Sequence, residues 1–324
     1  MPTESKSILV VGGAGFIGSH MVLALQEAGF QPVVLDNLSK GHRDAVNVDF
    51  VHGDMADKDT LAALFKKYPI AAVMHFASFI EVAESVREPA KYYQNNVAAT
   101  LHLLDVMLEH KVEHFIFSSS AAVYGEPRYT PIDEAHPIAP INPYGRTKWM
   151  VEEIIKDYAK ANALQYALLR YFNAAGADPA GRLRERHEPE SHLIPLVLQV
   201  AQGKRDQIII YGNDYATPDG TCVRDYVHVS DLCAAHLLAL QQCFRGQSGI
   251  YNLGTGRGHS VQEVVDAAAR VTGHPIPAIY SARRAGDPAV LVADAALAMQ
   301  VLDWQPVYPD LDTIITHAWH SLLS

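Results

Sequence analysis

The sequence predicts an α/β protein: a doubly wound parallel sheet, followed by a smaller α/β domain towards the C-terminus. Two observations support this prediction. Short, β-branched apolar runs alternate with longer helical patterns through the first 175 of the 324 residues, and such alternation implies right-handed crossovers between parallel strands. The first apolar run also ends in a glycine-rich turn that opens a helix, as in sheets that bind dinucleotides.

The first strand, turn and helix carry the clearest motif. Residues 8–11 form the apolar run, and Gly12, Gly15 and Gly18 follow with Gly-x-x-Gly-x-x-Gly spacing. A second β-rich run, residues 32–35, ends at Asp36. Glycines let a pyrophosphate approach the backbone, and the helix N-terminus offers N–H groups. Asp36 can accept both ribose hydroxyls and would repel a 2′-phosphate, so NAD is predicted over NADP.

The next strands end in polar residues. The run 50–51 leads to Asp54, the run 71–76 to residues 76–78, and the run 114–117 to residues 118–120. Helices are predicted over 58–67 and 89–109 between them. Ligands bind at the carboxyl ends of parallel strands, so a functional role is favoured for Asp54 and Ser120. For the remaining polar residues, a role as helix caps or loop residues stays open.

Tyr144 and Lys148 are four residues apart in a helix predicted to run to about residue 163. This spacing puts both side chains on one helix face. A nearby ammonium favours the phenolate, so we expect Lys148 to lower the pKa of Tyr144 from its ordinary value of about 10. Tyr144 could then take a proton from an alcohol near neutral pH. Ser120, at a strand tip, completes this catalytic candidate.

From residue 178 the sequence changes character. Residues 178–192 are polar and contain three arginines, which predicts a mobile segment rather than a packed element. Helices are expected over 193–202, 228–242 and 260–272, and strands over 207–211, 250–253 and 276–280. We therefore expect a dinucleotide-binding domain over 1–175, with a return of the chain near 225–255, and a mainly substrate-binding domain over 176–324.

Composition excludes several classes of protein. The formal net charge of −10 disfavours a nucleic-acid binder, and no run reaches the ~18 apolar residues of a membrane span. The three cysteines have neither disulfide nor metal spacing, which is consistent with a cytoplasmic protein. His110 with His114, and His317 with His320, have helical spacing, but no carboxylate or cysteine partner is implied, so no metal is expected.

Several motifs together resemble the extended short-chain dehydrogenase/reductase family, and most closely its UDP-glucose 4-epimerases. The resemblance rests on VGGAGFIGSH (11–20), LDNL (35–38), SSSAAVYG (118–125), YGRTK (144–148), LLRYFN (168–173), YGNDY (211–215), GTCVRDYVHV (220–229) and YNLG (251–254). It implies a Rossmann-type fold and NAD-dependent inversion at C4 of a UDP-hexose through a 4-keto sugar. Homodimers built on the helices near 89–109 and 144–163 are common in this family.

The resemblance also implies roles for individual residues. Tyr144 would be the acid/base, Lys148 would bind the nicotinamide ribose, and Ser120 would hydrogen-bond the reacting oxygen. The residues implied to bind NAD are Gly12, Gly15, Phe16, Ile17, Gly18, Asp36, Asn37, Leu38, Ser39, Asp54, Met55, Phe76, Ala77, Ser78, Asn95, Ser120, Tyr144, Lys148 and Phe172. The residues implied to bind the UDP-sugar are Ser120, Tyr144, Asn173, Leu193, Tyr211, Arg224, Arg284, Asp287 and Leu291.

Related activities differ in the residues after the serine. Nucleotide-sugar dehydratases and decarboxylases of the family place acids there, whereas Ser120 is followed by Ala121 and Ala122. This favours epimerisation over elimination, and the intact triad disfavours a non-catalytic NAD-binding protein. Arg224 and Arg284 suit a pyrophosphate clamp, although pairing with Asp225 and Asp287 is the alternative.

Four positions depart from the family pattern: Val11, Ile80, His192 and Leu291. Leu291 stands where some members carry a tyrosine that closes the sugar pocket. The smaller side chain predicts some turnover of UDP-N-acetylglucosamine. A UDP-pentose substrate also stays open.

Overall fold

The computed structural model describes residues 6–284 and 286–323. The chain divides into two units. The first comprises residues 1–125, 138–170 and 233–251, and the second comprises residues 126–137, 171–232 and 252–324. The first five residues of the predicted first domain lie outside the described part. No described helix combines the length and the apolar character needed to cross a membrane.

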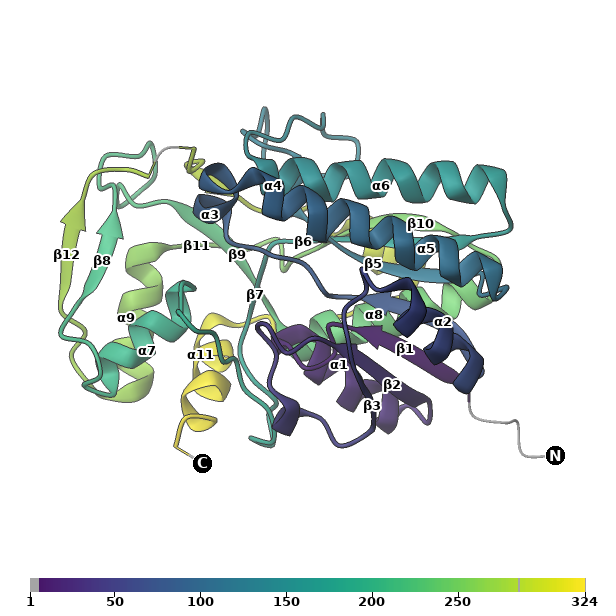
Figure 1. Cartoon of the computed structure of the whole chain (residues 1–324). Helices are drawn as coiled ribbons and strands as arrows, with labels where there is room; N and C mark the ends of the chain where they lie inside the picture. Colours follow the sequence, from purple (N-terminus) through teal and green to yellow (C-terminus); the bar gives the residue numbers. More distant parts are fainter. Residues whose placement is uncertain (1–5, 285, 324) are drawn as a thin grey trace. The chain divides into compact units, whose positions relative to one another are not determined.

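The first unit is built on a seven-stranded sheet with the order β10-β6-β5-β4-β1-β2-β3 (Figure 1). Because β1 pairs in parallel with both β2 and β4, the winding direction reverses at β1, where such sheets bind ligands. The strands are β1 (Ser7–Val11), β2 (Gln31–Asp36), β3 (Asp49–His52), β4 (Ile70–His75), β5 (His114–Ser120), β6 (Gln165–Tyr171) and β10 (Gly249–Leu253).

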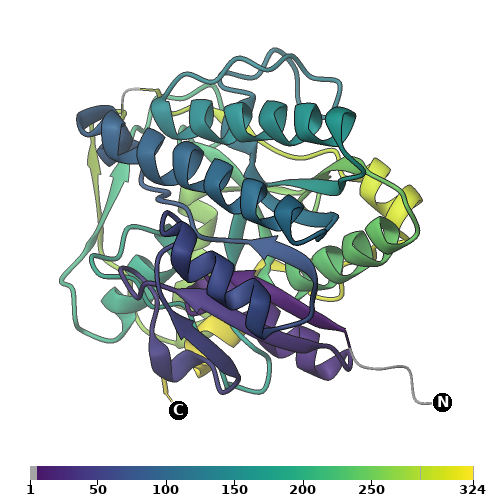
Figure 2. The ribbon, with the colours of Figure 1, turned by 45° about the vertical axis from the view of Figure 1, so that its right-hand side comes forward.

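Helices cover this sheet, and α5 and α6 run side by side along one face (Figures 1 and 2). Every residue of β1 is buried, which is typical of a central parallel strand. The helical segments are α1 (Phe16–Glu27), η1 (Arg43–Ala45), α2 (Lys58–Lys67), α3 (Val82–Arg87), α4 (Pro89–Tyr92), η2 (Tyr93–Ala98), α5 (Ala99–Glu109), η3 (Ala121–Val123), α6 (Pro143–Ala161) and α8 (Val229–Phe244).

The helix predicted over 89–109 exists but is not uniform. Its middle, η2, has π-helical hydrogen bonding between α4 and α5. A π turn holds one residue more than an α turn and is frequent near functional sites. The turn includes Asn95 and Asn96, and asparagine has a lower helix propensity than alanine or leucine.

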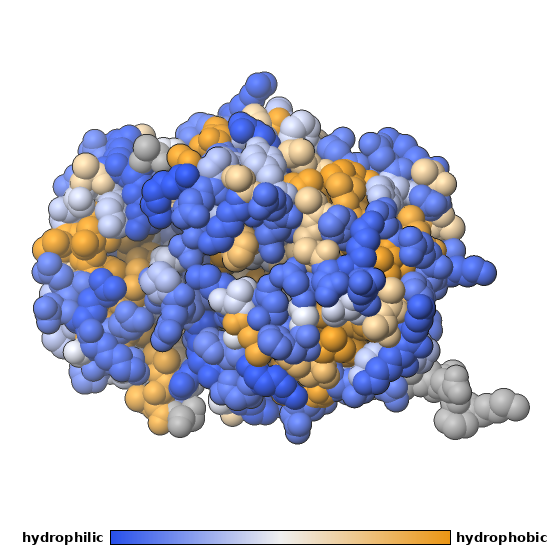
Figure 3. Space-filling model, viewed as in Figure 1, coloured by the Kyte–Doolittle hydropathy of each residue, from blue (hydrophilic) through white to orange (hydrophobic). Residues whose placement is uncertain are grey.

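In the second unit, β9 (Val223–His228) pairs with β7 (Asn173–Ala175), β11 (Gly258–Ser260) and β13 (Val290–Leu291). A separate parallel pair joins β8 (Ile208–Tyr211) to β12 (Ala278–Ser281). Figure 3 shows hydrophobic atoms over this pair, where Ile209 and Ile279 are exposed. The helices are α7 (Leu193–Ala201), α9 (Val261–Thr272), α10 (Ala296–Leu302) and α11 (Leu311–His320).

The core of the second unit lies among α7, α9 and α11, with Val197, Val264 and Ile315 almost fully buried. Ser260 caps α9 as predicted, and Glu263 completes a capping box by accepting from the Ser260 backbone N–H. The segment 178–192 is irregular as expected. That it is mobile rather than packed stays a prediction; within it Arg182 forms a two-pronged ion pair with Asp178, and Arg184 donates to Ser321 O at 2.9 Å.

Candidate active site

The glycine turn after β1 fits closely against the loop that follows β4. Gly12 has a φ of +78°, and a Cβ at this position would lie 2.6 Å from Ala77 N, so only glycine is accommodated. Helix α1 then begins at Phe16 with no side-chain cap and no acidic residue in its first turn. A helix N-terminus of this kind favours an anionic group.

Asp36 holds the turn and the end of β2 together. Its Oδ2 accepts from Ala14 N at 2.9 Å, and its Oδ1 accepts from Leu38 N at 2.8 Å. Leu38 takes a φ of +60°, which is uncommon for a residue other than glycine. Since each carboxylate oxygen can accept more than one hydrogen bond, Asp36 can still receive the two hydroxyls of a ribose.

Asn37, Ser39 and Asp54 lie together beside Asp36, at the ends of β2 and β3. Asn37 donates from Nδ2 to Asp54 Oδ2 at 2.7 Å and accepts from Ser39 N at 3.0 Å. Met55, next along the chain, is 4% exposed. These predicted cofactor residues therefore form one polar group next to a buried apolar residue, which suits the adenosine end of a dinucleotide.

Lys148 is anchored at the ends of β4 and β5. Its Nζ donates to Ser78 Oγ at 2.9 Å and to Ser118 O at 2.7 Å, and the residue is 3% exposed. Burial lowers the pKa of Lys148 to about 7, against the opposing negative charge of Glu152. Lys148 thus holds a fixed position from which one further donor can reach a ligand.

Tyr144 departs from the prediction made from its spacing to Lys148. Burial raises the pKa of its phenol above the ordinary value, and a hydrogen bond from Ser120 opposes that shift only in part. The Lys148 Nζ lies 6.0 Å from the centre of the Tyr144 ring. The predicted lowering by Lys148 is therefore wrong for the protein by itself, because desolvation of the phenolate dominates. The pairing of Ser120 with Tyr144 agrees with the sequence analysis.

A buried ion pair lies one helical turn beyond Lys148 and was missed in the sequence. Glu152 is fully buried, accepts from Ser119 Oγ at 2.5 Å, and receives Nε and Nη2 of Arg170 at 2.9 and 2.5 Å. Arg170 also donates to Tyr124 Oη at 3.0 Å. The residues come from β5, α6 and β6, so no local spacing reveals the pair.

Asn96, rather than its predicted neighbour Asn95, connects the elements around the triad. Its side chain accepts from Phe79 N at 2.9 Å and donates to Phe79 O at 3.0 Å. It also donates to Thr147 Oγ1 at 3.2 Å. Thr147 in turn donates to the carbonyl oxygen of Tyr144. Asn95 donates to Asn96 Oδ1 at 2.9 Å.

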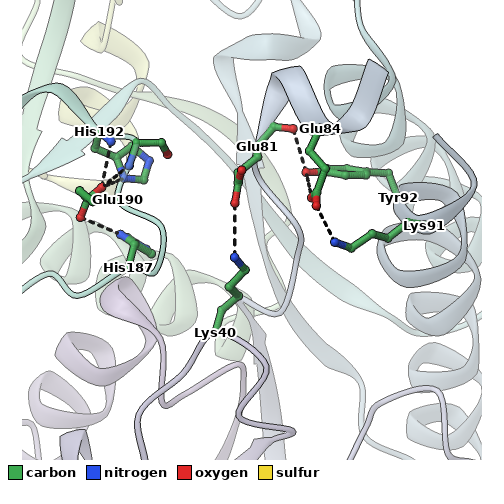
Figure 4. Close-up of polar contacts among 9 residues, drawn as sticks. Lys40, Glu81, Glu84, Lys91, Tyr92, His187, Glu190 and His192 are labelled. Carbon is green, nitrogen blue, oxygen red and sulfur yellow. Dashed lines mark hydrogen bonds and ion pairs between the residues drawn. The ribbon is translucent and has the colours of Figure 1, made fainter. Parts of the chain in front are cut away.

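Charged residues fix α3 beside the start of α6. In Figure 4, Lys40 reaches Glu81, and Tyr92 and Lys91 both reach Glu84. The Glu84 pKa is lowered by its hydrogen bonds to Lys91 and Tyr92. On the same short helix, the buried Ser85 accepts from Tyr144 N at 3.2 Å. The loop after β2 is thereby connected through α3 to the helix that carries Tyr144.

The predicted substrate residues lie in the second unit, apart from Ser120 and Tyr144. Arg224, on β9, is already engaged: it donates to Val223 O, Pro288 O and Asp287 Oδ1, each at 2.8 Å. The alternative pairing with Asp225 is wrong, because Asp225 instead accepts from Thr255 and Gly256. A guanidinium has five N–H donors, so Arg224 keeps two for a ligand.

Arg284 is exposed, and its guanidinium carbon lies 3.9 Å from the centre of the Tyr211 ring. This cation–π contact presents a planar cation next to an aromatic face, an arrangement that can bind phosphate oxygens and a base. Its predicted alternative, an ion pair with Asp287, is replaced by the Arg224–Asp287 pair. Leu291 is partly buried on β13, in register with Arg224.

The remaining predicted residues occupy the ends of elements in the second unit. Asn173 begins β7, and Leu193 begins α7 with its side chain partly buried. Phe172, predicted as a cofactor residue, also belongs to this unit and donates from its N–H to Leu253 O.

The first unit fits a dinucleotide. The glycine turn leaves no space for a Cβ at Gly12, the α1 N-terminus carries no acidic residue, and Asp36 stands at the end of the next strand. NAD would be held by these three features, with Lys148 and Tyr144 at its reactive end.

The chain is similar to several known proteins. The sequence pattern of the NAD dependent epimerase/dehydratase family matches residues 8–254. The UDP-glucose 4-epimerase of Halalkalibacterium halodurans is 54% identical over 97% of this chain and 95% of that protein. The crystal structure of UDP-glucose 4-epimerase from Brucella ovis in complex with NAD is 51% identical, with a TM-score of 0.95 over 98% of each chain. The corresponding Bifidobacterium longum structure, in complex with NAD+ and UDP, is 38% identical, with a TM-score of 0.94 over 98% of each chain.

Proposed function

The chain belongs to the NAD dependent epimerase/dehydratase family, and from this we propose that it is an enzyme that inverts C4 of UDP-glucose and UDP-galactose with bound NAD. Its likeness to UDP-glucose 4-epimerases covers nearly its whole length. The observation that carries the proposal is the grouping of Ser120, Tyr144 and Lys148 in the first unit, with alanines at the two positions after Ser120.

Those alanines restrict the chemistry. Residues 121–123 form the short helix η3, and Ser120 Oγ accepts from Ala122 N at 3.2 Å. Gly145 packs directly against Ala122 O, so a Cβ there would overlap it. With alanines at 121 and 122, neither position offers an acid that could eliminate water or assist decarboxylation. This supports proton exchange at one oxygen over those reactions.

Tyr144 is proposed to take the proton from the C4 hydroxyl of the sugar and to return it on the other face of the 4-keto sugar. When bound, oxidised NAD supplies the acceptor for the C4 hydride and a positive charge that favours the Tyr144 phenolate. Ser120 would donate a hydrogen bond to the reacting oxygen. The overall reaction would involve no net redox change, so NAD would not need to be exchanged between turnovers.

Lys148 is proposed to fix the ribose next to the nicotinamide rather than to set the charge of Tyr144 by itself. Its bonds to Ser78 and Ser118 hold the ammonium in one place. Since burial lowers the Lys148 pKa to about 7, a ligand hydroxyl that accepts a hydrogen bond from the ammonium would help to keep it charged. Glu152 opposes further loss of that charge.

The substrate residues are proposals of the same kind. We assign Arg284 and the two remaining donors of Arg224 to the pyrophosphate of UDP, and Tyr211, Asn173 and Leu193 to the rest of the nucleotide. Asp287 would act by holding Arg224 in position. Residues 1–175, with the return near 225–255, are proposed to bind NAD, and residues 176–324 mainly the UDP-sugar.

Two further proposals concern the protein in the cell. Exposed Trp149 on α6 supports a homodimer that uses α5 and α6, and light scattering on the purified protein would test it.

The three cysteines are buried and form no disulfide, which supports a location in the reducing cytoplasm.

The activity is tested by incubating the purified protein with UDP-galactose or UDP-N-acetylgalactosamine without added NAD. We expect UDP-glucose to form from the first substrate. Product from the second would extend the function to N-acetylhexosamines, for which the smaller Leu291 is the supporting observation. No C4-inverted product from either substrate, with NAD bound, would contradict the proposal.

Tyr144→Phe tests the mechanism. It keeps the ring and removes the only group proposed to carry the proton, so we expect turnover to fall by roughly 10²–10⁴-fold while bound NAD is retained. Tyr158→Phe is the matched control, because Tyr158 lies on the same helix but bonds Asp105 at 2.6 Å. Turnover near the wild-type rate in Tyr144→Phe would overturn the role of Tyr144.

A further inference from the structure

Four side chains that could bind a metal converge in the segment before α7. Glu185, His187, Glu190 and His192 follow each other with the spacing Glu-x-His-x-x-Glu-x-His. Their ligating atoms all lie within 4.8 Å of one another. In Figure 4, His187, Glu190 and His192 point towards a common centre. All four belong to the second unit, so the cluster is complete within one part of the chain.

The spacing of the donor atoms suits a tetrahedral ion. His192 Nδ1 lies 2.9 Å from Glu185 Oε1 and 3.3 Å from Glu190 Oε1. His187 Nδ1 lies 3.2 Å from Glu185 Oε1 and 3.6 Å from Glu190 Oε2. Ligands that are each about 2.0–2.2 Å from a tetrahedral zinc are roughly 3.3–3.6 Å apart. Two of the four separations lie in that range, and the other two, 2.9 and 3.2 Å, are slightly shorter, so the donors are close enough to share one ion.

His192 approaches both carboxylates through one ring nitrogen. Its Nδ1 is buried and makes no hydrogen bond of regular geometry with the described residues, although a carboxylate oxygen lies 2.9 Å away. Two carboxylate oxygens thus lie close to one ring nitrogen, an arrangement that a shared cation or a proton on the ring can stabilise.

The carboxylates are buried and one is already oriented. The side chains of Glu185 and Glu190 are each 7% exposed. Glu190 Oε1 also accepts from Ser191 N at 2.8 Å and from His192 N at 2.9 Å. Backbone donors of this kind fix a ligating carboxylate in position. Two such buried carboxylates need a positive partner, which protonated His187 and His192 supply in the absence of metal and a divalent cation would supply in their place.

The donor set indicates which ion. Two neutral imidazoles and two carboxylates balance the charge of one divalent cation. Nitrogen and oxygen donors in tetrahedral arrangement suit zinc, whereas magnesium and calcium take oxygen ligands in larger coordination shells. Four protein ligands leave no open position for a substrate, which is typical of structural zinc.

We propose that Glu185, His187, Glu190 and His192 form a structural zinc site that closes the segment before α7. In the sequence, helical spacing points only to the pairs His110 with His114 and His317 with His320. In the structure those histidines have other contacts: His114 Nδ1 meets Ala71 O at 3.1 Å, and His317 Nδ1 meets His228 Nε2 at 3.0 Å. The four residues of the proposed site lie in a segment without helix or strand, so helical spacing in the sequence does not reveal them. It does not depend on the proposed enzymatic function.

The first experiment measures metal in the NAD-loaded protein. The protein is stripped with a chelator, dialysed against limiting zinc, and assayed for zinc by elemental analysis. We expect one ion per chain. Substitution by cobalt should give the strong visible absorption of a tetrahedral ion, a readout that needs no variant. Less than one tenth of an ion per chain, or only the weak colour of octahedral cobalt, would overturn the proposal.

Variants test the assignment of the ligands. Glu185→Gln and His192→Gln should each weaken zinc binding by more than the roughly 10–100-fold expected for an outer-shell residue. Glu188→Gln, in the same segment but outside the cluster, is the matched control and should bind zinc as the wild type does. Retained NAD and an unchanged circular dichroism spectrum show that each variant is folded. Equal zinc affinity in all three variants would mean that the ion binds elsewhere and would overturn the assignment.

Limited trypsin digestion gives a local readout. Arg184 and Arg186 lie inside the segment that the ion would close, and cleavage requires that segment to open. Zinc should slow cleavage at both arginines in the wild type and leave the rate unchanged in Glu185→Gln. Equal protection of wild type and variant by zinc would contradict the site.

Discussion

The surroundings of Lys148 and those of Arg284 show two ways of holding a cation. Lys148 is buried, bonded to Ser78 and Ser118, and followed one turn later by the buried Glu152–Arg170 pair. Arg284 is exposed and rests on the face of Tyr211. The first arrangement allows one position of the charge, and the second lets it adjust. In the proposed function, the proton chemistry needs the fixed cation and the nucleotide needs the adaptable one.

The largest effect should come from breaking the buried pair. Arg170→Met leaves the carboxylate of Glu152 uncompensated, so we expect the free energy of unfolding to fall by about 3–5 kcal/mol. Denaturant unfolding of the NAD-free protein measures it. Arg270→Met is the control: Arg270 and Asp312 form an exposed pair, and its loss should leave stability unchanged. Similar losses in both variants would remove the distinction between buried and exposed pairs.

The next effect depends on pH. Burial lowers the Lys148 pKa to about 7, below its ordinary 10.5, so between these values the unfolded chain binds more protons than the folded one. Stability should therefore rise with pH across this window, by at most about 1.4 kcal/mol per pH unit from this group. Lys148→Met should lack this rise in the free energy of unfolding. The contribution of Lys148 is the difference in that free energy between wild type and Lys148→Met, measured without NAD from pH 7 to 10. A difference that does not change with pH would contradict the lowered pKa.

A third test compares two neighbouring arginines. Arg284→Ala should raise KM for UDP-galactose roughly 10–100-fold, the effect of one charge-assisted contact, with a smaller change in kcat. Arg283→Ala is the matched control, because Arg283 already pairs with Asp214 at 2.7 Å. An equal rise in KM for the two variants would mean that the loss of positive charge in this region, rather than a direct contact with pyrophosphate, causes the effect.

The smallest effect concerns the sugar. Leu291→Tyr adds bulk on β13 and should lower turnover of UDP-N-acetylgalactosamine relative to UDP-galactose by several-fold to about 100-fold, the range for steric discrimination in a pocket. Competition between the two substrates in one assay measures the ratio directly. Val290→Tyr, one residue earlier and on the opposite side of the strand, provides the control. An unchanged turnover ratio in Leu291→Tyr would show that this residue does not influence which sugar is turned over.

Local patterns in the sequence predicted a large part of this molecule. The Gly12 turn, the strand ending at Asp36 and the helix cap at Ser260 each depend on a few neighbouring residues, and the structure has all three. The position of Tyr144 and Lys148 on one helix followed from their spacing in the same way.

Properties that depend on distant residues were not predictable. The Tyr144 pKa moved opposite to expectation because burial, which no spacing reveals, outweighs a lysine on the same face. The Glu152–Arg170 pair joins a helix to a strand 18 residues away. Arg224 pairs with Asp287 rather than with the adjacent Asp225. The two residues become neighbours only when β9 and the loop before β13 come together in the folded chain. These effects depend on tertiary contacts, which local patterns in a single sequence do not reveal.

The π turn η2 can be described as a one-residue insertion in a helix. Deleting one residue from it would restore a regular α-helix, whose backbone alone would be more favourable. It would also rotate every residue on one side of the deletion by about 100° relative to the other. Asn96 could then no longer face Phe79 and Thr147 together. The extra residue therefore sets the rotation of α4 relative to α5, so that the Asn96 side chain can bond both Phe79 and Thr147.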